Sequence, residues 1–162
     1  MYLKRTIGEN LTLFRSRDFP FKRYDCSRLR YTALIGMGGN VGDVRRRFSH
    51  LLHFLRRQKK LRVCQTSSIL ENPPFGYLDQ PFFYNAVIAV ETSMQPHALL
   101  AYLHRIENRF GRVRSFKDAP RTLDLDILFY DEREIKSKNL IVPHKEWYKR
   151  ESVTIPLMEM DI

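Results

Sequence analysis

The chain has 162 residues, of which 43% are hydrophobic, and a formal net charge of +10. This length and composition favour one globular domain with a buried core and exclude a largely disordered chain. Its apolar stretches are too short to span a bilayer, and no apolar signal region follows the first basic residues. We therefore expect a cytoplasmic protein that does not bind membranes.

The only two cysteines are Cys26 and Cys64. They could pair with each other, but two cysteines in a chain of this length are more typical of free thiols in a cytosolic protein. Nothing around them resembles a metal or redox motif. We therefore expect both thiols to be free.

The positive charge is unevenly distributed. Residues 1–30 hold eight basic and three acidic side chains, which is half of the net charge. The arginines at 45–47 and 56–57 are interpreted as the solvated face of a helix. Basic residues between 105 and 121 flank two aspartates, which fits a polyphosphate with its metal as well as it fits RNA.

The first expected element is a strand over residues 31–35, which leads into a Gly/Asn-rich turn. Asp43 is a suitable N-cap, and apolar residues at helical spacing predict an amphipathic helix over residues 44–58. The next strand is expected over residues 62–70, where the Pro73-Pro74 turn follows it.

Residues 83–91 are apolar on both faces, which predicts a central strand. Pro96 is placed to begin a second helix, although Gln95 is a poor N-cap, and Gly111 is placed to end it. The last strand of the pattern lies within residues 120–130, which read PRTLDLDILFY.

The order β-α-β-β-α-β is that of a ferredoxin-like α+β sandwich, in which both helices cover one face of an antiparallel sheet. We expect one domain over residues 31–162, with short C-terminal additions that include a helical turn near residues 145–150. Residues 1–30 form a basic extension, interpreted as an extra strand, a docking segment or a mobile segment.

The strand PRTLDLDILFY carries two aspartates on one face. Side chains two apart on a strand point the same way, so Asp124 and Asp126 share a face with Thr122. Neighbouring carboxylates repel, and a bound cation relieves the repulsion. Oxygen ligands without a His or Cys cluster favour Mg²⁺ over zinc. The alternative is a solvated strand face whose aspartates pair with basic neighbours.

Basic side chains lie on both sides of this strand in the sequence. Arg112 and Arg114 precede it, Arg121 begins it, and His144 and Arg150 follow it. Each arginine alone is expected to be a surface residue. Together, beside a magnesium site, they form a clamp suited to a polyphosphate.

Several short segments follow one another in an order that is specific when they are taken together. They are Gly38-Gly39-Asn40 with Gly42-Asp43, Asn72–Gly76, Asp79–Asn85, Arg105-Ile106-Glu107, Gly111–Arg114, Pro120–Ile127, Val142-Pro143-His144 and Pro156-Leu157. In order and spacing they resemble the 6-hydroxymethyl-7,8-dihydropterin pyrophosphokinase family of folate biosynthesis, over about residues 31–157. GRVR followed by PRTLDLDI carries most of the resemblance.

The resemblance implies transfer of a diphosphoryl group from ATP to the hydroxymethyl oxygen of the pterin, with AMP as the other product. It implies two Mg²⁺ ions held by Asp124 and Asp126, and it makes Asp126 the candidate that orients or deprotonates the attacking hydroxyl. Arg112 and Arg121 become catalytic phosphate contacts. We expect a monomer that binds these two small molecules and no nucleic acid.

The resemblance also implies which residues bind each substrate. The ATP-binding candidates are Leu100, His104, Glu107, Arg114, Arg121, Ile127, His144 and Arg150. The pterin-binding candidates are Asn72, Pro73, Phe75, Phe83 and Asn85. A flat pterin requires a ring to stack on and an amide that both donates and accepts, which Phe83 and Asn85 supply from one strand face.

Three positions depart from the family pattern. Gly39 stands where similar enzymes have a serine, and Ser152 stands where they stack an aromatic ring on the second face of the pterin. Trp147 or an aromatic residue of the extension is a candidate replacement. The loop between Arg114 and Pro120 is shorter than a common form and lacks its tryptophan.

Two other interpretations remain open from the sequence. The fold and charge would suit an RNA-recognition module, but neither apolar strand carries the aromatic RNP1 pattern, and two aspartates would repel RNA. An inactive relative of the family is the other interpretation. The retained residues Asn85, Arg121, Asp124 and Asp126 argue against it.

Overall fold

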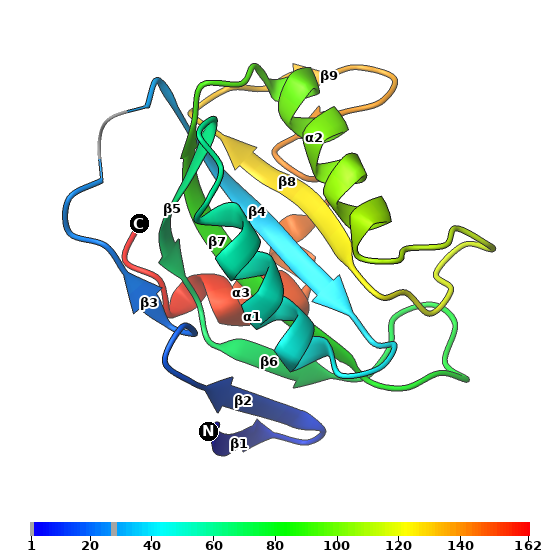
Figure 1. The fold of residues 1–162 in the computed structure, drawn as a ribbon. Helices are drawn as coiled ribbons and strands as arrows, with labels where there is room; N and C mark the ends of the chain where they lie inside the picture. The colour runs from blue at the N-terminus through cyan, green and yellow to red at the C-terminus, as the bar shows by residue number, and fades with distance from the viewer. Residues whose placement is uncertain (1, 27–28) are drawn as a thin grey trace.

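The computed structural model describes residues 2–26 and 29–162 (Figure 1). In chain order its elements are β1 (Leu3–Gly8), β2 (Leu11–Arg15), β3 (Phe21–Lys22), β4 (Tyr31–Gly39), α1 (Val44–Leu55), β5 (Leu61–Thr66), β6 (Ile69–Asn72), β7 (Phe83–Thr92), α2 (Pro96–Arg109), β8 (Asp124–Tyr130), β9 (Ile135–Lys136), β10 (Ile141–Val142), a 3-10 helix (Trp147–Lys149) and α3 (Glu151–Met158).

Eight of these strands form one sheet whose described pairings are all antiparallel. The order is β1-β2-β6-β7-β4-β8, and β5 pairs with both β7 and β3. β7 contacts β4 along one side and β5 and β6 along the other, so it lies at the centre of the sheet. This confirms the central strand predicted over residues 83–91.

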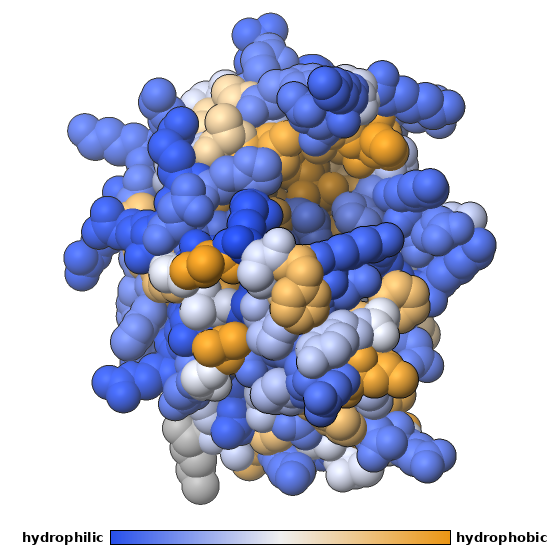
Figure 2. All heavy atoms as spheres, turned by 90° about the vertical axis from the view of Figure 1, so that its right-hand side faces the viewer, coloured by the Kyte–Doolittle hydropathy of each residue, from blue (hydrophilic) through white to orange (hydrophobic). Residues whose placement is uncertain are grey.

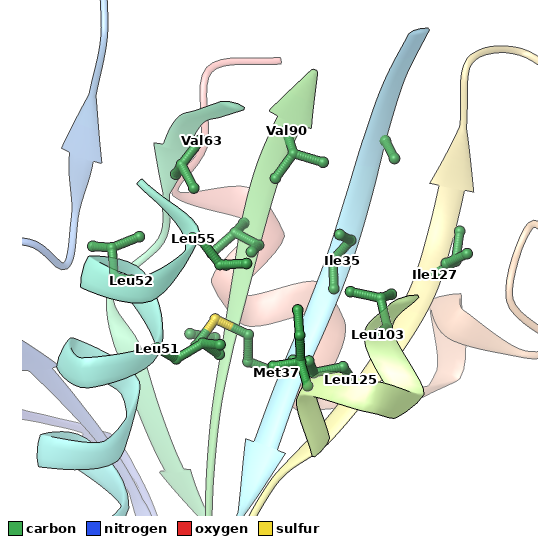
Figure 3. Packing of buried hydrophobic residues seen from close by; sticks show 14 of the residues in the cluster. Ile35, Met37, Leu51, Leu52, Leu55, Val63, Val90, Leu103, Leu125 and Ile127 are labelled. Atoms are coloured by element: carbon green, nitrogen blue, oxygen red, sulfur yellow. The ribbon is translucent and has the colours of Figure 1, made fainter. Parts of the chain in front are cut away.

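Helices cover both faces of the sheet. α1 and α2 lie on one face, and α3 lies on the other (Figure 1). The larger core fills the space under α1 and α2, where Leu51, Leu55 and Leu103 meet Met37 and Leu125 from the strands (Figure 3). A smaller cluster, Val87, Leu128, Val153 and Met160, lies on the α3 side. The chain is a mixed α/β protein with a mostly antiparallel sheet.

The sequence located most elements but missed one strand break. The helix predicted over residues 44–58 is Val44–Leu55, and Asp43 caps it by accepting a hydrogen bond from the Arg46 amide at 3.2 Å. The single strand predicted over residues 62–70 is wrong, because the chain passes from β5 to β6 at Ser67 and Ser68. Ser67 stays tied to β7, since its hydroxyl accepts from the Val87 amide at 2.9 Å.

The N-terminal segment adds strands to the sheet, as the first of the three interpretations predicted. β2 pairs with β6, and β3 pairs with β5. Arg45 of α1 fastens the hairpin, since its Cζ lies 4.3 Å from the ring centroid of Phe14 and 4.8 Å from that of Tyr2. Arg45 therefore does not belong to a solvated helix face, whereas Arg46 does.

The expectation of two free thiols is wrong in this structure. Cys26 and Cys64 form a disulfide. The pairing of β3 with β5 brings them together, because the Arg23 amide donates to the Cys64 carbonyl at 2.8 Å. None of the described helices combines the length and apolar character that a bilayer crossing requires.

Candidate active site

A pocket opens on the α3 side of the sheet, where β4, β7 and β8 meet the loops that follow β6 and α2. Its lining residues are Gly36, Met37, Gly38, Asn72, Phe75, Phe83, Asn85, Ala86, Asp118, Arg121, Asp124, Asp126, Leu128, His144, Arg150, Ser152 and Val153. The two loops project from one side of the sheet (Figure 1). The surface on this side is mostly hydrophilic, with scattered hydrophobic side chains (Figure 2).

Two aspartates of β8 line this pocket. Asp124 and Asp126 alternate with Leu125 and Ile127, which are buried in the core under α1 and α2. The strand periodicity that predicted a shared face for the two carboxylates is confirmed. β4 opposes them with glycines, since Gly38 pairs with Asp124 and Gly36 with Asp126.

A side chain at residue 38 would fill the pocket. A Cβ atom on Gly38 would lie 2.8 Å from Oδ1 of Asn85, so the glycine keeps open the space beside that amide. Gly39 has a different reason to be glycine. A Cβ there would lie 2.5 Å from the Thr122 carbonyl oxygen, because the backbone before β8 packs directly on residue 39.

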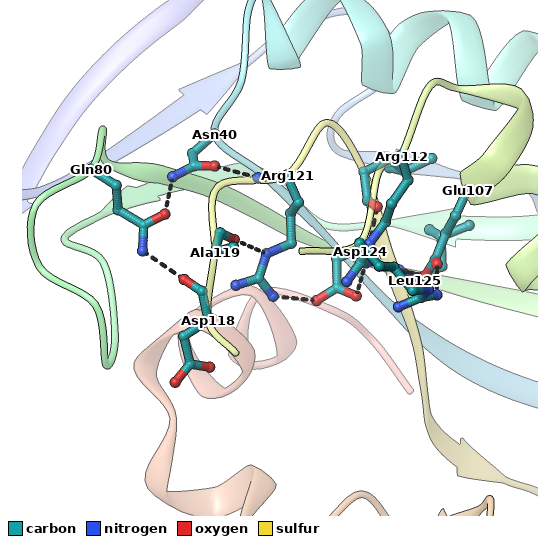
Figure 4. Close-up of polar contacts among 11 residues, drawn as sticks. Asn40, Gln80, Glu107, Arg112, Asp118, Ala119, Arg121, Asp124 and Leu125 are labelled. Carbon is teal, nitrogen blue, oxygen red and sulfur yellow. Dashed lines mark hydrogen bonds and ion pairs between the residues drawn. The ribbon is translucent and has the colours of Figure 1, made fainter. Parts of the chain in front are cut away.

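The two aspartates differ in how their charge is compensated. Arg112 Nη1 lies 2.6 Å from Asp124 Oδ1, and Arg121 Nη1 lies 3.3 Å from Asp124 Oδ2 (Figure 4). No arginine or lysine of the described chain forms such an ion pair with Asp126. Both of these ion pairs therefore compensate the charge of Asp124.

Asp126 is an acid with a shifted pKa. Burial is the largest cause, and the nearby Asp124 and Glu107 add to it, so that the pKa of Asp126 rises to about 7. Burial disfavours the charged form, and like charges disfavour it further. A set of neighbouring carboxylate oxygens with too little positive charge has the donor chemistry that suits a hard divalent cation. Asp124 and Asp126 thus fit the magnesium site that the sequence predicts.

Glu107 of α2 binds the basic loop and the start of β8 through its buried carboxylate. It is 1% exposed, and it accepts hydrogen bonds from the Leu125 amide at 2.8 Å and from Arg114 at 2.7 Å. Burial raises the pKa of Glu107, although the bond from Leu125 and the charge of Arg112 oppose this shift. Glu107 joins the end of α2 to β8 and to the basic loop.

Two asparagine amides and two rings form the wall opposite the aspartates. Asn85 Nδ2 donates to Asn72 Oδ1 at 2.7 Å, which fixes both side chains beside the pocket. Phe83 is 8% exposed, and the Cζ of Arg121 lies 5.0 Å from its ring centroid. Phe75 is 76% exposed, and its ring faces Arg150 at 5.8 Å.

Asn40 and Gln80 connect the loops around the pocket through side-chain hydrogen bonds. Asn40 donates to Gln80 Oε1 at 2.9 Å and accepts from the Arg121 amide at 3.0 Å (Figure 4). Gln80 in turn donates to the Asp118 carbonyl at 2.9 Å. The loop after β6 and the loop before β8 are therefore linked to each other and to the end of β4.

His144 and Arg150 complete the rim, from the segment that follows β10. The His144 amide donates to the Leu128 carbonyl at 2.9 Å. Burial and the charge of Arg150 lower the pKa of His144, which favours the neutral imidazole. Trp147 is not available as a second pterin ring, since it packs on Phe129 at a centroid distance of 5.0 Å.

The structure gathers some predicted site residues in the pocket and leaves others outside its lining. Those in the lining are Asn72, Phe75, Phe83, Asn85, Arg121, Asp124, Asp126, His144 and Arg150. Those outside are Pro73, Leu100, His104, Glu107, Arg112, Arg114 and Ile127. Ile127 is only 3% exposed in the core, whereas His104 is exposed on α2.

Several lining residues were not predicted from the sequence. Gly36, Leu128 and Val153 line the pocket, but a glycine or an apolar residue in the sequence does not by itself indicate a binding site. Asn40 and Gln80 lie inside the segments that carry the resemblance but outside the pocket lining, and the sequence does not show their hydrogen bonds to distant residues.

Comparisons with known proteins agree with this geometry. The profile of the family described as "7,8-dihydro-6-hydroxymethylpterin-pyrophosphokinase (HPPK)" matches residues 34–162. Among curated proteins, the 2-amino-4-hydroxy-6-hydroxymethyldihydropteridine pyrophosphokinase of Campylobacter jejuni is 40% identical over 88% of this chain and 91% of its own length. The proteins of the same name from Helicobacter pylori and Bacillus subtilis are 38% identical, over 90% of each chain, and 39% identical, over 79% of this chain and 77% of theirs. The chain therefore belongs to the HPPK family.

Proposed function

We infer that this chain transfers the β,γ-diphosphoryl group of ATP to the hydroxymethyl oxygen of 6-hydroxymethyl-7,8-dihydropterin, in folate biosynthesis. Family membership and the names of the relatives support this reaction. The observation that carries it in this chain is the meeting of three features in one pocket. They are the carboxylates Asp124 and Asp126, the guanidinium of Arg121 and the amide of Asn85.

The reaction is a displacement at the β-phosphorus of ATP. The pterin oxygen forms a new bond to that phosphorus, the bond between it and the oxygen bridging to the α-phosphorus breaks, and AMP leaves. The hydroxyl proton must also leave. Asp126, with a pKa of about 7, would accept a hydrogen bond or the proton from that hydroxyl.

The pterin would bind between the two rings of the pocket wall. Asn72, Pro73 and Asn85 would hold its donor and acceptor edge, since an amide supplies both kinds of hydrogen-bonding group. Phe83 would stack on one face. Phe75 lines the same pocket with most of its ring exposed, so it would supply the second face that Ser152 lacks.

ATP would approach over the basic loop. Arg112, Arg121 and Arg114 would exchange their bonds with Asp124 and Glu107 for bonds with phosphate oxygens. The remaining predicted contacts are Leu100, His104, Glu107 and Ile127 for adenosine and His144 and Arg150 for phosphate or ribose. A neutral His144 would donate or accept a hydrogen bond without adding charge.

Asp124 and Asp126 would hold Mg²⁺, in the two-ion form that the resemblance implies. When bound, magnesium would neutralise charge on the phosphates and on the two carboxylates. Arg112 and Arg121 would then be released from Asp124. The hydrogen bonds of Asn40 and Gln80 would hold both loops in position while these bonds are exchanged.

We further propose the ferredoxin-like arrangement for residues 31–162. The path β4-α1-β5/β6-β7-α2-β8, with the strand order β6-β7-β4-β8, supports it. Residues 1–30 would be an extension of this single catalytic domain. A monomeric, cytoplasmic protein is the corresponding proposal for its assembly and location.

The test is to incubate the protein with ATP, Mg²⁺ and 6-hydroxymethyl-7,8-dihydropterin and to identify the nucleotide product. Pterin-dependent formation of AMP supports the proposal. Formation of ADP would mean transfer of a single phosphoryl group. No turnover by a folded sample would indicate an inactive relative.

A further inference from the structure

A second cluster of metal-ligating side chains lies at the other end of β7, away from the pocket. It consists of Cys26, Cys64 and Glu91, whose ligand atoms all lie within 4.8 Å of one another. The cluster joins three parts of the chain: the N-terminal extension, β5 and the last residues of the central strand β7.

The local backbone places these side chains together. The pairing of β5 with β7 shifts register between Val63 and Gln65, so Cys64 is the extra residue of a bulge. A bulge re-aims the side chain that it carries. The Cys64 carbonyl, which is free of the β7 ladder, accepts from the Arg23 amide at 2.8 Å, and this bond brings Cys26 to the same place.

Glu91 is an unusual residue for the centre of a sheet. It is 5% exposed, and the Leu29 amide donates to its Oε2 at 3.4 Å. Two sulfur atoms lie beside it. Cys26, Cys64 and Glu91 also line one groove, together with Phe129 and Leu157.

We propose that Cys26, Cys64 and Glu91 form a zinc site when the disulfide is reduced. Two thiolates and one carboxylate are a ligand set for Zn²⁺, unlike the all-oxygen set of Asp124 and Asp126. The groove supplies water for a fourth, tetrahedral position. Ligand atoms around such an ion lie about 3–4 Å apart, so the cluster needs only a small opening of its bonded sulfur atoms.

The two states of the cluster exclude each other. A phosphine reductant supplies two electrons that break the Sγ–Sγ bond, two protons complete the thiols, and the phosphine takes the oxygen of a water molecule. Zinc then displaces the two thiol protons to solvent as it binds. In either state the extension is fastened to β5, by a covalent bond or through the ion.

The reduced state is the relevant one for an ATP-consuming enzyme of the cytoplasm, where disulfides are rare. This clause rests on the location proposed above, but the site itself does not depend on the pterin reaction. A failed metal test would leave pterin turnover untouched, and a failed turnover test would leave the metal site untouched.

Cobalt is the sharpest probe, because thiolate ligands give Co²⁺ a charge-transfer band in the near ultraviolet. The chain has only two cysteines, so any such band reports on this cluster and not on the carboxylates of β8. We expect the full-length, phosphine-reduced protein to develop the band at one equivalent of Co²⁺ and to lose it when Zn²⁺ is added. The oxidised protein should develop none.

Three variants locate the ligands. Cys64→Ser and Cys26→Ser should each lose most of the band, and either one suffices if the other fails to fold. Glu91→Gln should keep a thiolate band but require more Co²⁺, whereas Asp124→Asn should behave as wild type. The proposal is overturned if the reduced wild type gives no band, or only one at large excess of Co²⁺ that Zn²⁺ does not displace.

Discussion

The two ends of β7 hold their surroundings together by different means. At its start, Asn85 and Phe83 face a pocket whose parts are joined by side-chain hydrogen bonds and ion pairs. At its end, Glu91 faces a disulfide that joins the extension to β5. Bonds of the first kind can be exchanged directly for bonds to a ligand, whereas the disulfide must first be reduced. The catalytic end is therefore adaptable, and the opposite end is fixed.

The largest expected effect comes from Asp126→Ala at the adaptable end. The variant should fold, because Asp126 makes no ion pair with the described basic side chains, but its turnover should fall by roughly 10³-fold or more. Steady-state formation of AMP measures this. Glu91→Gln, at the end of β7 that lies away from the pocket, is the matched control and should retain wild-type turnover. Wild-type-like turnover of Asp126→Ala would remove the metal assignment.

Breaking the fixed end should cost stability and leave chemistry intact. In oxidising, metal-free buffer, Cys26→Ser should lower the free energy of unfolding by about 3 kcal/mol, because the disulfide closes a loop of 38 residues. Urea denaturation monitored by circular dichroism measures the loss. The reduced wild type should match the variant under the same metal-free conditions. Equal stability of the variant and the oxidised wild type would contradict the expectation.

The shifted pKa of Asp126 predicts a pH-dependent gain from Asp126→Asn in metal-free protein. The folded-state pKa of about 7 lies above the ordinary value of 3.8 for this carboxyl, so the folded state holds this proton more tightly than the unfolded state. Below about pH 4 both states are protonated and the variant gains nothing from this group. As the pH rises to 7 the wild type loses stability, and the variant should become more stable by on the order of 4 kcal/mol.

Thermal unfolding at pH 4, 5.5 and 8 follows this difference without interference from groups that both proteins share. Asp118→Asn is a matched control, since Asp118 lines the same pocket and its carboxylate belongs to neither ion pair of Asp124. A difference between Asp126→Asn and wild type that shrinks as the pH rises would contradict the assigned direction.

The smallest of these effects concerns the second ring of the pterin site. Phe75→Ala should raise the KM for the pterin about fivefold and change the KM for ATP little, because a stacked ring pair contributes about 1 kcal/mol. Leu78→Ala is the control in the same loop, because Leu78 is 74% exposed and does not line the pocket. An unchanged pterin KM in Phe75→Ala would assign the second face to another group.

The strand that carries the two pocket aspartates could be predicted because its signal is local. Alternation along β8 placed Asp124 and Asp126 on one face, and the burial of Leu125 and Ile127 follows the same period. Asp43, Pro96 and Gly111 likewise marked helix ends through their own conformational preferences.

The other features depended on contacts between distant residues. The helical turn predicted near residues 145–150 is the 3-10 helix Trp147–Lys149. α3 is not predicted, because Pro156 lies inside it and its apolar residues show little helical periodicity. The break at Ser67 and Ser68 is stabilised by Val87, twenty residues away along the chain. The disulfide requires β3 to pair with β5, which no local pattern of Cys26 or Cys64 reveals.

The edge strand β1 would favour aggregation if it carried less charge. All six residues of β1 are exposed, and within the described residues β1 pairs only with β2. Such an edge offers unpaired backbone groups on which a second molecule could add a strand and begin to aggregate. Lys4 and Arg5 place like charges on this edge, so two copies repel each other there, and added salt should weaken that protection.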